Sequence, residues 1–124
     1  TDGGFVWGCP TSTLWTAVKY GASFLAVIFN NQVYGAERRN QYDFFGERYF
    51  FTDLENPSFA QVAEDMGAQG VRISRAQAIA PAVADAFRAD RPVVIEIDID
   101  PKALNEPYRR DALKFPERTL PKYR

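Results

Sequence analysis

Two short motifs near the start of the sequence carry residues that could bind a metal-complexed phosphate group. Asp2-Gly3-Gly4 opens the chain, and Asn30-Asn31 comes directly after an apolar run. When two such motifs each follow a parallel strand, they meet at the same edge of the sheet, where open α/β sheets bind ligands. Glycines after a strand let backbone amides approach phosphate oxygens, here the amides of Gly4 and Phe5. The pattern predicts a cofactor site for a diphosphate held through a divalent metal.

The candidate metal ligands are oxygen atoms. Asp2 offers a carboxylate, Asn31 offers an amide oxygen, and a backbone carbonyl around Val33 offers a third ligand. Mg²⁺ suits such ligands, and it usually takes one or two protein groups together with phosphates and water. Each motif alone is ordinary turn chemistry, so it is their combination around one helix and one strand that favours a site.

The composition removes several kinds of active site. The sequence of 124 residues contains no histidine and one cysteine, Cys9. These counts exclude serine–histidine and cysteine–histidine catalysis, histidine metal sites and a structural zinc site within this chain. A net charge of −1 does not point to nucleic acid, and no apolar run is long enough to cross a bilayer. A single cysteine fits a reducing compartment, so we expect a cytoplasmic protein.

Helices and strands must alternate to position the two motifs. Residues 10–21 show helical spacing of apolar side chains and end at a glycine. Residues 24–29 are an unbroken apolar run, which is typical of a central parallel strand covered on both faces. The patterns further predict a helix beginning at Asn56-Pro57-Ser58, followed by a strand at 69–73. A second helix capped by Ser74 comes next, and a strand at 93–99 follows it. The predicted inner face of this second helix is formed by Ile79, Ala82, Val83, Ala86 and Phe87.

Residues 32–56 stand apart, because they are rich in aromatic and charged side chains and have no clean periodicity. Such a stretch indicates a functional loop or an interface segment, and the alternative is that the aromatic side chains only pack down the loop or fill a subunit contact.

The order (β)αβ–loop–αβαβ predicts the α/β class, with a parallel sheet and helices on both faces. We expect residues 1–101 to form this domain without its N-terminal part, because the chain opens on what reads as the end of a strand and its turn. Residues 102–124 contain three prolines and no core pattern, so we expect a C-terminal arm that packs on the rest of a longer enzyme.

Asp2-Gly3 and Asn30-Asn31 resemble the Gly-Asp-Gly…Asn-Asn motif of thiamine-diphosphate enzymes, in their C-terminal pyrophosphate-binding domain. Thr1 stands where the motif has its first glycine. The resemblance spans nearly the whole chain through Leu14-Trp15-Thr16-Ala17, Tyr34-Gly35, Asn56-Pro57-Ser58-Phe59-Ala60, Met66-Gly67 and Arg91-Pro92-Val93-Val94-Ile95-Glu96. It implies the thiamine-diphosphate-binding fold.

The resemblance also implies roles for particular residues. Asp2, Asn31 and the carbonyl of Val33 would bind Mg²⁺. The implied cofactor-binding set is Asp2, Gly3, Gly4, Phe5, Asn31, Val33, Tyr34 and Gly35. No catalytic residue is implied in this chain, because the glutamate that activates thiamine belongs to the N-terminal pyrimidine-binding domain, usually of a neighbouring subunit. We therefore expect a homodimer or homotetramer, and no activity from the 124 residues alone.

Residues 34–44 and the tail segments 106–114 and 121–124 are similar to sulfoacetaldehyde acetyltransferases, which convert sulfoacetaldehyde and phosphate to acetyl phosphate and sulfite. Residues 9–15 instead resemble decarboxylase-like or acetolactate-synthase-like members. Because sulfonate and phosphate are anions that guanidinium groups bind well, candidate substrate ligands are Arg38, Arg39, Arg48, Arg109 and Arg110. For each arginine, the alternative is a solvated or subunit-bridging role.

Two other functions stay open at this point. An acetolactate synthase or 2-oxo-acid decarboxylase would use the same cofactor on another small-molecule substrate. A catalytically silent domain would keep the fold for assembly or regulation. A plain nucleotide-binding Rossmann domain is disfavoured, because the sequence has no Gly-x-Gly-x-x-Gly turn.

Overall fold

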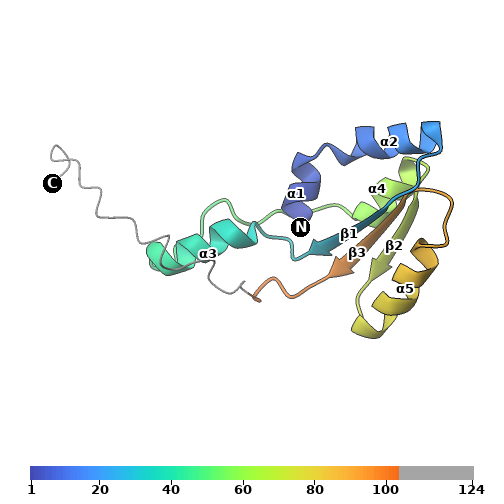
Figure 1. Cartoon of the computed structure of the whole chain (residues 1–124). Helices are drawn as coiled ribbons and strands as arrows, with labels where there is room; N and C mark the ends of the chain where they lie inside the picture. The colour runs from blue at the N-terminus through green and yellow to red at the C-terminus, as the bar shows by residue number, and fades with distance from the viewer. Residues whose placement is uncertain (104–124) are drawn as a thin grey trace.

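The computed structural model describes residues 1–103, and residues 104–124 lie outside this description. The described chain forms a three-stranded parallel sheet flanked by helices (Figure 1). In chain order the elements are α1 (Asp2–Trp7), α2 (Pro10–Tyr20), β1 (Leu25–Asn30), α3 (Gly35–Phe44), α4 (Phe59–Asp65), β2 (Gln69–Ile73), the short 3₁₀ helix η1 (Ala76–Ala78), α5 (Ile79–Ala86) and β3 (Val93–Asp98).

The sheet has the order β1-β3-β2, so the last strand of the described chain lies in its centre. The register pairs Asn30 with Asp98 on one side and Ile73 with Ile97 on the other. Val93-Val94-Ile95 in β3 is fully buried, as expected for a central parallel strand that is covered on both faces. The carboxyl ends of all three strands therefore lie at one edge of the sheet.

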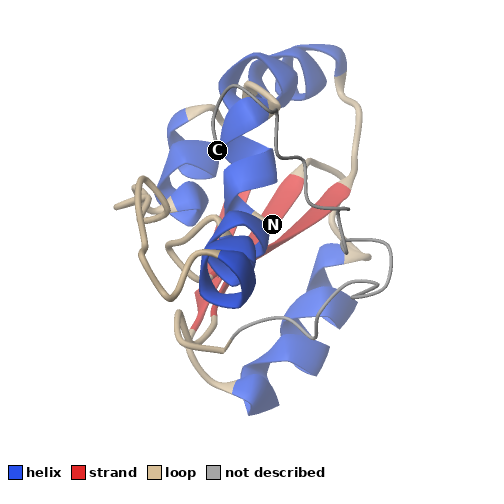
Figure 2. Ribbon diagram, turned by 90° about the vertical axis from the view of Figure 1, so that its left-hand side faces the viewer, coloured by secondary structure: helices blue, strands red, loops and turns tan. Residues whose placement is uncertain are grey.

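Helices lie on both sides of the sheet (Figure 2), and a hydrophobic cluster joins them to each face. On one face, α2 and α4 pack on β1 and β3 through Leu14, Ile28, Phe59 and Val94. On the other face α5 packs on β2 and β3, where the buried residues are Ile73, Ala86, Val93, Ile95 and Ile97. This arrangement confirms the predicted α/β class and the prediction of helices on both faces.

Local sequence signals account for the boundaries of α4. Ser58 caps its start by accepting a hydrogen bond from the amide of Gln61 at 3.3 Å, and Gly67 follows its end with a φ of +85°. Gly70 in β2 has a steric reason to be glycine, because a Cβ there would lie 2.0 Å from the carbonyl oxygen of Ala60. Helix α4 therefore packs directly against the backbone of β2.

The start of the chain differs from its prediction as a turn after a strand. Asp2-Gly3-Gly4 forms the first turn of α1, and Thr1 caps this helix by accepting a hydrogen bond from the amide of Gly4 at 3.3 Å. The threonine side chain makes this cap possible, whereas a glycine at the same position has no side-chain acceptor.

Residues 32–56 contain a helix, α3, and are therefore not a continuous loop. Helix α3 buries none of its residues, so it has no apolar stripe for periodicity to detect. An ion pair between Arg39 and Asp43, one helical turn apart, supports it.

The prediction for the start and inner face of α5 was wrong at two residues. Ser74 does not cap the helix, because the chain first passes through η1 and the N-cap of α5 is Ala78, which makes no side-chain cap bond. Phe87 follows the last turn of α5 and is 77% exposed, while Ala86 takes the buried position.

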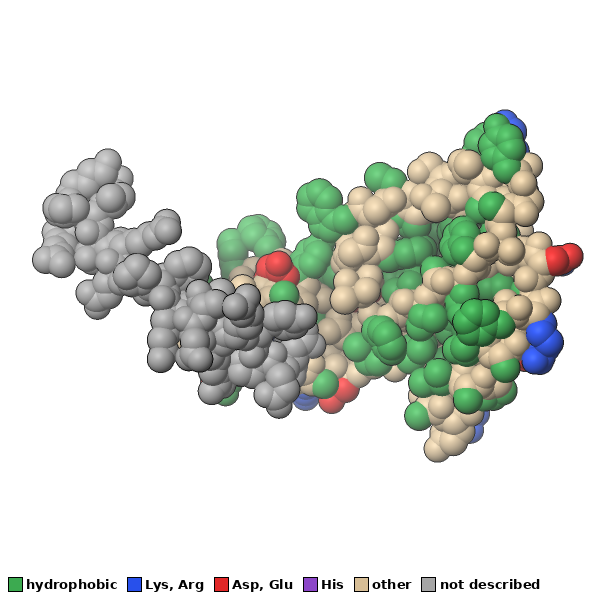
Figure 3. All heavy atoms as spheres, in the orientation of Figure 1, with side chains coloured by type: hydrophobic (Ala, Val, Ile, Leu, Met, Phe, Trp, Pro, Cys, Tyr) green, Lys and Arg blue, Asp and Glu red, His purple; other side chains and the backbone are tan. Residues whose placement is uncertain are grey.

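One side of β1 stays partly uncovered, because α5 packs over β2 and β3. Val27 and Phe29 are 37% and 50% exposed, and hydrophobic side chains gather between α2 and α5 in the space-filling view (Figure 3). Within residues 1–103, no helix has the length and apolar character needed to span a membrane.

Candidate functional site

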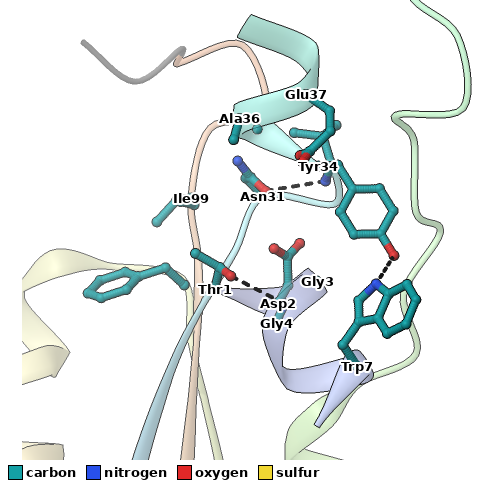
Figure 4. Close-up of a pocket in the computed structure, with 13 residues that line it drawn as sticks. Thr1, Asp2, Gly3, Gly4, Trp7, Asn31, Tyr34, Ala36, Glu37 and Ile99 are labelled. Carbon is teal, nitrogen blue, oxygen red and sulfur yellow. Dashed lines mark hydrogen bonds between the residues drawn. The ribbon is translucent and has the colours of Figure 1, made fainter. Parts of the chain in front are cut away.

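A cavity of about 520 Å³ opens at the carboxyl edge of the sheet, where β1 ends and α1 and α3 begin. Its lining comes from segments far apart in the sequence (Figure 4): Thr1, Asp2, Gly3, Gly4, Trp7, Phe29, Asn31, Val33, Tyr34, Gly35, Ala36, Glu37 and Ile99. The volume lies within the range typical of small-molecule and cofactor sites. The two motifs singled out in the sequence thus meet in one cavity.

Asp2 is held firmly from one side. The residue is 2% exposed, and its Oδ2 atom accepts hydrogen bonds from the backbone amide of Gln32 at 2.9 Å and from Nδ2 of Asn56 at 3.0 Å. No hydrogen bond within residues 1–103 involves the other oxygen, Oδ1. The carboxylate points toward the part of the cavity that carries Asn31 and Tyr34 (Figure 4). Asp2 therefore has one fixed oxygen and one oxygen that can take a ligand.

The turn after β1 aims backbone amides at the site. Gln32 has a φ of +62°, a left-handed conformation that costs a non-glycine residue free energy, and in it the Gln32 amide faces Asp2. Asn31 accepts a hydrogen bond at Oδ1 from the amide of Val33 at 3.2 Å, which closes a short turn and orients the Asn31 side chain beside the cavity. Carbonyl oxygens have two lone pairs, so this bond leaves Oδ1 able to accept another partner.

Val33 is fixed by a short antiparallel pairing with Asp53. The amide of Tyr34 donates to the carbonyl of Thr52 at 2.8 Å, and the amide of Leu54 donates to the carbonyl of Gln32 at 2.9 Å. These bonds use the groups on either side of Val33, so the carbonyl of Val33 itself lies outside the pairing. Val33 lines the cavity and its backbone is held in position, while metal binding by its carbonyl stays a prediction.

Gly3 packs against Tyr34. A Cβ on Gly3 would lie 2.6 Å from Cε1 and 2.8 Å from Cδ1 of the tyrosine ring, closer than van der Waals contact allows. The Tyr34 hydroxyl in turn accepts a hydrogen bond from Nε1 of Trp7 at 3.2 Å. Gly3 is therefore needed for the approach of the tyrosine ring, a reason that the sequence pattern did not supply.

The amides of Gly4 and Phe5 do not face the cavity as free donors in this structure. Gly4 donates to Oγ1 of Thr1, and Phe5 donates to the carbonyl of Thr1 at 3.0 Å, so both serve the first turn of α1. The ring of Phe5 packs on Phe59 in the core, with ring centroids 5.2 Å apart. Gly4 lines the cavity and Phe5 does not, which corrects the expectation that both amides point toward a phosphate group.

Among residues 1–103, the charged side chains that line the cavity are both acidic, namely Asp2 and Glu37. Arg38 instead pairs with Asp53 at 2.6 Å and lies over the ring of Tyr49 at 4.4 Å.

Arg39 pairs with Asp43 at 2.8 Å, and Arg48 donates to the carbonyl of Phe45 at 3.1 Å. None of Arg38, Arg39 and Arg48 lines the cavity, while Arg109 and Arg110 lie outside the described residues. Substrate binding by these arginines stays a prediction.

The oxygen donors of the cavity fit a hard divalent cation that also binds phosphate. Asp2 offers one free carboxylate oxygen and Asn31 one amide oxygen, which are the ligand types that Mg²⁺ takes. No group of three or more carboxylate, cysteine or histidine side chains in residues 1–103 could hold a metal ion. The protein groups are thus too few to enclose a cation alone, and they suit one whose remaining ligands are phosphate oxygens and water.

Comparison with known protein families identifies the fold and its cofactor class. Residues 1–97 match the family model described as thiamine pyrophosphate enzyme, C-terminal TPP binding domain. The chain belongs to this family. The resemblance drawn from Asp2-Gly3 and Asn30-Asn31 is thereby confirmed.

Relatives of this thiamine pyrophosphate enzyme domain carry several activities. A sulfoacetaldehyde acetyltransferase of Castellaniella defragrans is 41% identical over 122 residues, which are 95% of this chain and 20% of the relative. The mitochondrial catalytic subunit of acetolactate synthase from Saccharomyces cerevisiae is 29% identical over 101 residues, which are 82% of this chain and 15% of the relative. The chain thus spans about a fifth or less of the length of these relatives.

A solved structure shows the same fold. The thiamine diphosphate-dependent 4-hydroxybenzoylformate decarboxylase of Rhodococcus jostii RHA1 matches with a TM-score of 0.73 and 27% identity, covering 86% of this chain and 19% of that one. The predicted thiamine-diphosphate-binding fold is therefore confirmed.

Seven of the eight residues in the predicted cofactor-binding set line the cavity, the exception being Phe5. Sequence reasoning did not assign the walls from Trp7, Phe29 and Ile99, the carboxylate of Glu37, or the contact of Asn56 with Asp2. The available signal for Asn56 was its place directly before Pro57, in the segment that leads into the Ser58 cap of α4. For the apolar walls no motif marks the position, because they come from the ends of ordinary strands and from the exposed end of α1.

Proposed function

We propose that this domain holds the diphosphate of thiamine diphosphate through a Mg²⁺ ion that binds Asp2, Asn31 and the backbone carbonyl of Val33. The observation that carries the proposal is the charge of the cavity, where the charged side chains supplied by the described part of the chain are the carboxylates of Asp2 and Glu37. A diphosphate beside two carboxylates needs a cation to offset the repulsion. A divalent ion held by Asp2 and Asn31 would supply that charge, which agrees with the oxygen donors present.

The residues of this chain position the cofactor rather than perform the chemistry. When bound, thiamine diphosphate would supply the electron sink for negative charge that develops at the carbonyl carbon of a substrate as an adjacent bond breaks. Asp2 and Asn31 anchor the diphosphate end, because both lie at the carboxyl edge of the sheet on rigid backbone. Phe29 and Ile99 extend the cavity with apolar surface from the ends of β1 and β3.

A binding experiment on the full-length protein tests the metal site. Isothermal titration with thiamine diphosphate, with and without Mg²⁺, should show binding that depends on the metal, and Asp2→Ala should weaken it at least about tenfold. Asp53→Asn is the matched control, because Asp53 is an exposed carboxylate that pairs with Arg38 outside the cavity. Equal affinities of the wild type and Asp2→Ala in Mg²⁺ would refute the assignment.

For the whole enzyme we infer the reaction of a sulfoacetaldehyde acetyltransferase. The 41% identity to a relative of that name supports it, as does the similarity of residues 34–44 to that group. The activating glutamate would come from the pyrimidine-binding domain, in a homodimer or homotetramer. Sulfite release from sulfoacetaldehyde by the full-length protein with thiamine diphosphate, Mg²⁺ and phosphate is the test, and release should require phosphate.

A synthase or decarboxylase acting on 2-oxo acids is the second candidate. The acetolactate synthase relative and the structural match to a decarboxylase favour it. Carbon dioxide from pyruvate or benzoylformate, without sulfite from sulfoacetaldehyde, would select this reaction and keep the cofactor site. Cofactor binding without either product would favour a catalytically silent domain.

A further inference from the structure

A fully buried carboxylate lies in the centre of the sheet, away from the cavity. Glu96 of β3 is 0% exposed, and its neighbours along the strand are apolar. Its Oε1 accepts a hydrogen bond from Nδ2 of Asn30 at 2.8 Å. Its Oε2 accepts hydrogen bonds from Oγ of Ser58 and from the backbone amide of Ala60, both at 3.1 Å.

Burying a carboxylate is costly even when every lone pair has a donor, and an apolar side chain of similar volume is often at least as stable. The position of Glu96 between Ile95 and Ile97 would suit such a side chain in a central strand. Stability alone therefore does not account for a carboxylate here. Its contacts connect it to the site.

Glu96 sets the orientation of the Asn30 amide. Asn30 is also buried, and because its Nδ2 group donates to Glu96, its Oδ1 must face the opposite way. There Oδ1 accepts hydrogen bonds from the backbone amide of Gln32 at 3.2 Å and from Nδ2 of Asn56 at 3.1 Å. If the Asn30 amide were flipped, its NH₂ group would face the Gln32 amide and the Nδ2 group of Asn56, and no acceptor would remain on Asn30 for either of them.

The two donors that meet Asn30 are the same two that hold Asp2. The Gln32 amide and Nδ2 of Asn56 each lie between Oδ1 of Asn30 and Oδ2 of Asp2, at 2.9 Å and 3.0 Å from the latter. The backbone amide of Asn56 also donates to Oε1 of Gln32 at 2.6 Å, which locks these two residues together. A continuous hydrogen-bonded path thus runs from the start of α4 through Glu96 and Asn30 to the carboxylate of Asp2.

We propose that Glu96, Asn30 and Asn56 are positioning residues, which hold Oδ2 of Asp2 so that Oδ1 stays available to a cation in the cavity. This inference rests on the proposed function, in which Asp2 binds Mg²⁺. Groups that hydrogen-bond a metal ligand orient it, and their loss typically weakens metal affinity by about 10- to 100-fold. Glu96 acts at the far end of the path, by keeping the Asn30 amide in the one orientation that both donors tolerate.

The test measures metal affinity separately from fold stability. Full-length apoprotein with saturating thiamine diphosphate is titrated with Mn²⁺ as a spectroscopic probe for Mg²⁺, and free Mn²⁺ is followed by electron paramagnetic resonance. Asn56→Ala removes the side chain that donates to Asp2, and it should raise the Kd for Mn²⁺ about tenfold or more. The thermal midpoint of the apoprotein is recorded for each variant.

Ala63→Gly is the matched control for stability. Ala63 is a fully buried residue of α4 that carries no polar side-chain atom, so its replacement loosens the same helix without touching the path. We expect Ala63→Gly to lower the thermal midpoint and to leave the Kd for Mn²⁺ within about twofold of the wild type, since the donors to Asp2 remain.

Glu96→Gln provides a second variant that keeps the shape of the side chain. Its amide can accept from Ala60 only by turning its NH₂ group toward Nδ2 of Asn30, which drives the Asn30 amide to flip. We expect weaker Mn²⁺ binding from Glu96→Gln even though residue 96 does not touch the cavity.

The outcomes separate this inference from the proposed function. If wild type and Asn56→Ala bind Mn²⁺ equally, or if Ala63→Gly weakens binding as much as Asn56→Ala, the positioning role is refuted while the metal site stands. If the wild type binds no Mn²⁺ in the presence of thiamine diphosphate, the proposed function fails and this inference fails with it. Weakened binding in Asn56→Ala and Glu96→Gln, with Ala63→Gly unaffected, supports the inference.

Discussion

Adjacent glycines in the first turn of α1 should respond oppositely to replacement by alanine. In Gly3→Ala the new Cβ would lie 2.6 Å from Cε1 of Tyr34, so the ring must move by about 1 Å to reach a normal carbon–carbon separation. Overpacking of this kind costs about 1–3 kcal/mol. The displacement also strains the hydrogen bond from Trp7 to the Tyr34 hydroxyl, although this bond is exposed and contributes little. The higher helix propensity of alanine offsets about 1 kcal/mol of this cost, which leaves a net loss of up to about 2 kcal/mol.

In Gly4→Ala, the new Cβ meets only Oγ1 of Thr1, at 3.1 Å, and the residue is exposed. The exposed Thr1 side chain must then shift by a few tenths of an ångström, which weakens its cap bond to the residue 4 amide. The gain in helix propensity, up to about 1 kcal/mol, offsets this loss, so the thermal midpoint should stay unchanged or rise slightly. Thermal unfolding of the full-length apoprotein, followed by titration with thiamine diphosphate in Mg²⁺, compares the two variants. Gly3→Ala should lower both the midpoint and the affinity, because Tyr34 lines the cavity. If Gly3→Ala behaves like Gly4→Ala in both measurements, the contact between Gly3 and Tyr34 does not constrain the site.

Three further changes test other parts of the structure. Asp2→Asn keeps the shape of the side chain and removes its charge, so the metal-dependent affinity for thiamine diphosphate should fall at least about tenfold in a calorimetric titration. An unchanged affinity would contradict the assignment of Asp2 as a metal ligand. Gly70→Ala should destabilise the protein by about 3 kcal/mol or more, because the new Cβ would lie 2.0 Å from the backbone of Ala60, which cannot shift without moving α4. A soluble variant with the thermal midpoint of the wild type would show that α4 and β2 do not pack this closely. Arg38→Ala breaks a largely surface ion pair with Asp53 and should cost at most about 1 kcal/mol. In steady-state assays it should leave the KM for phosphate unchanged, and a rise in this KM would restore Arg38 as a substrate ligand.

The parts of the fold that the sequence predicted well are those with a strong local signal. The apolar run at 24–29 and the run at 93–99 became the paired parallel strands β1 and β3, and the predicted strand at 69–73 became β2. Such runs are informative because a parallel strand covered on both faces must be apolar almost throughout. The serine at the start of α4 and the glycine after it gave correct limits for the same reason, since capping depends on neighbouring residues alone.

Helices α1 and α3 were missed because each lacks such a signal. Helix α1 begins with aspartate and two glycines, which favour a turn, and it forms through the Thr1 cap and contacts to β1. Helix α3 buries no residue and therefore shows no apolar stripe. In both, the helix depends on contacts from elsewhere in the chain, which local propensity does not represent.

The same distinction applies to the site, where the sequence predicted the residues proposed to contact a ligand and missed the residues that hold those in place. The sequence named Asp2, Asn31 and Val33, because oxygen donors beside glycines and strand ends are recognisable chemistry. It did not name Asn56 or Glu96 as parts of the site, since they join Asp2 only in three dimensions.

The buried path behind Asp2 also explains why polar residues occupy positions that an apolar core could fill. A fully apolar replacement of Glu96 and Asn30 would lose little stability, or gain some, because no charge would then be buried. It would also remove the groups that fix the Asn56 side chain and the Gln32 amide, which hold Asp2. Gln32 adds a second cost, since its left-handed backbone is kept although a glycine would relieve the strain. Both features lower the stability of the fold, and both lead to hydrogen bonds on the same oxygen, Oδ2 of Asp2. What these two costs have in common is therefore that they fix the position of the Asp2 carboxylate.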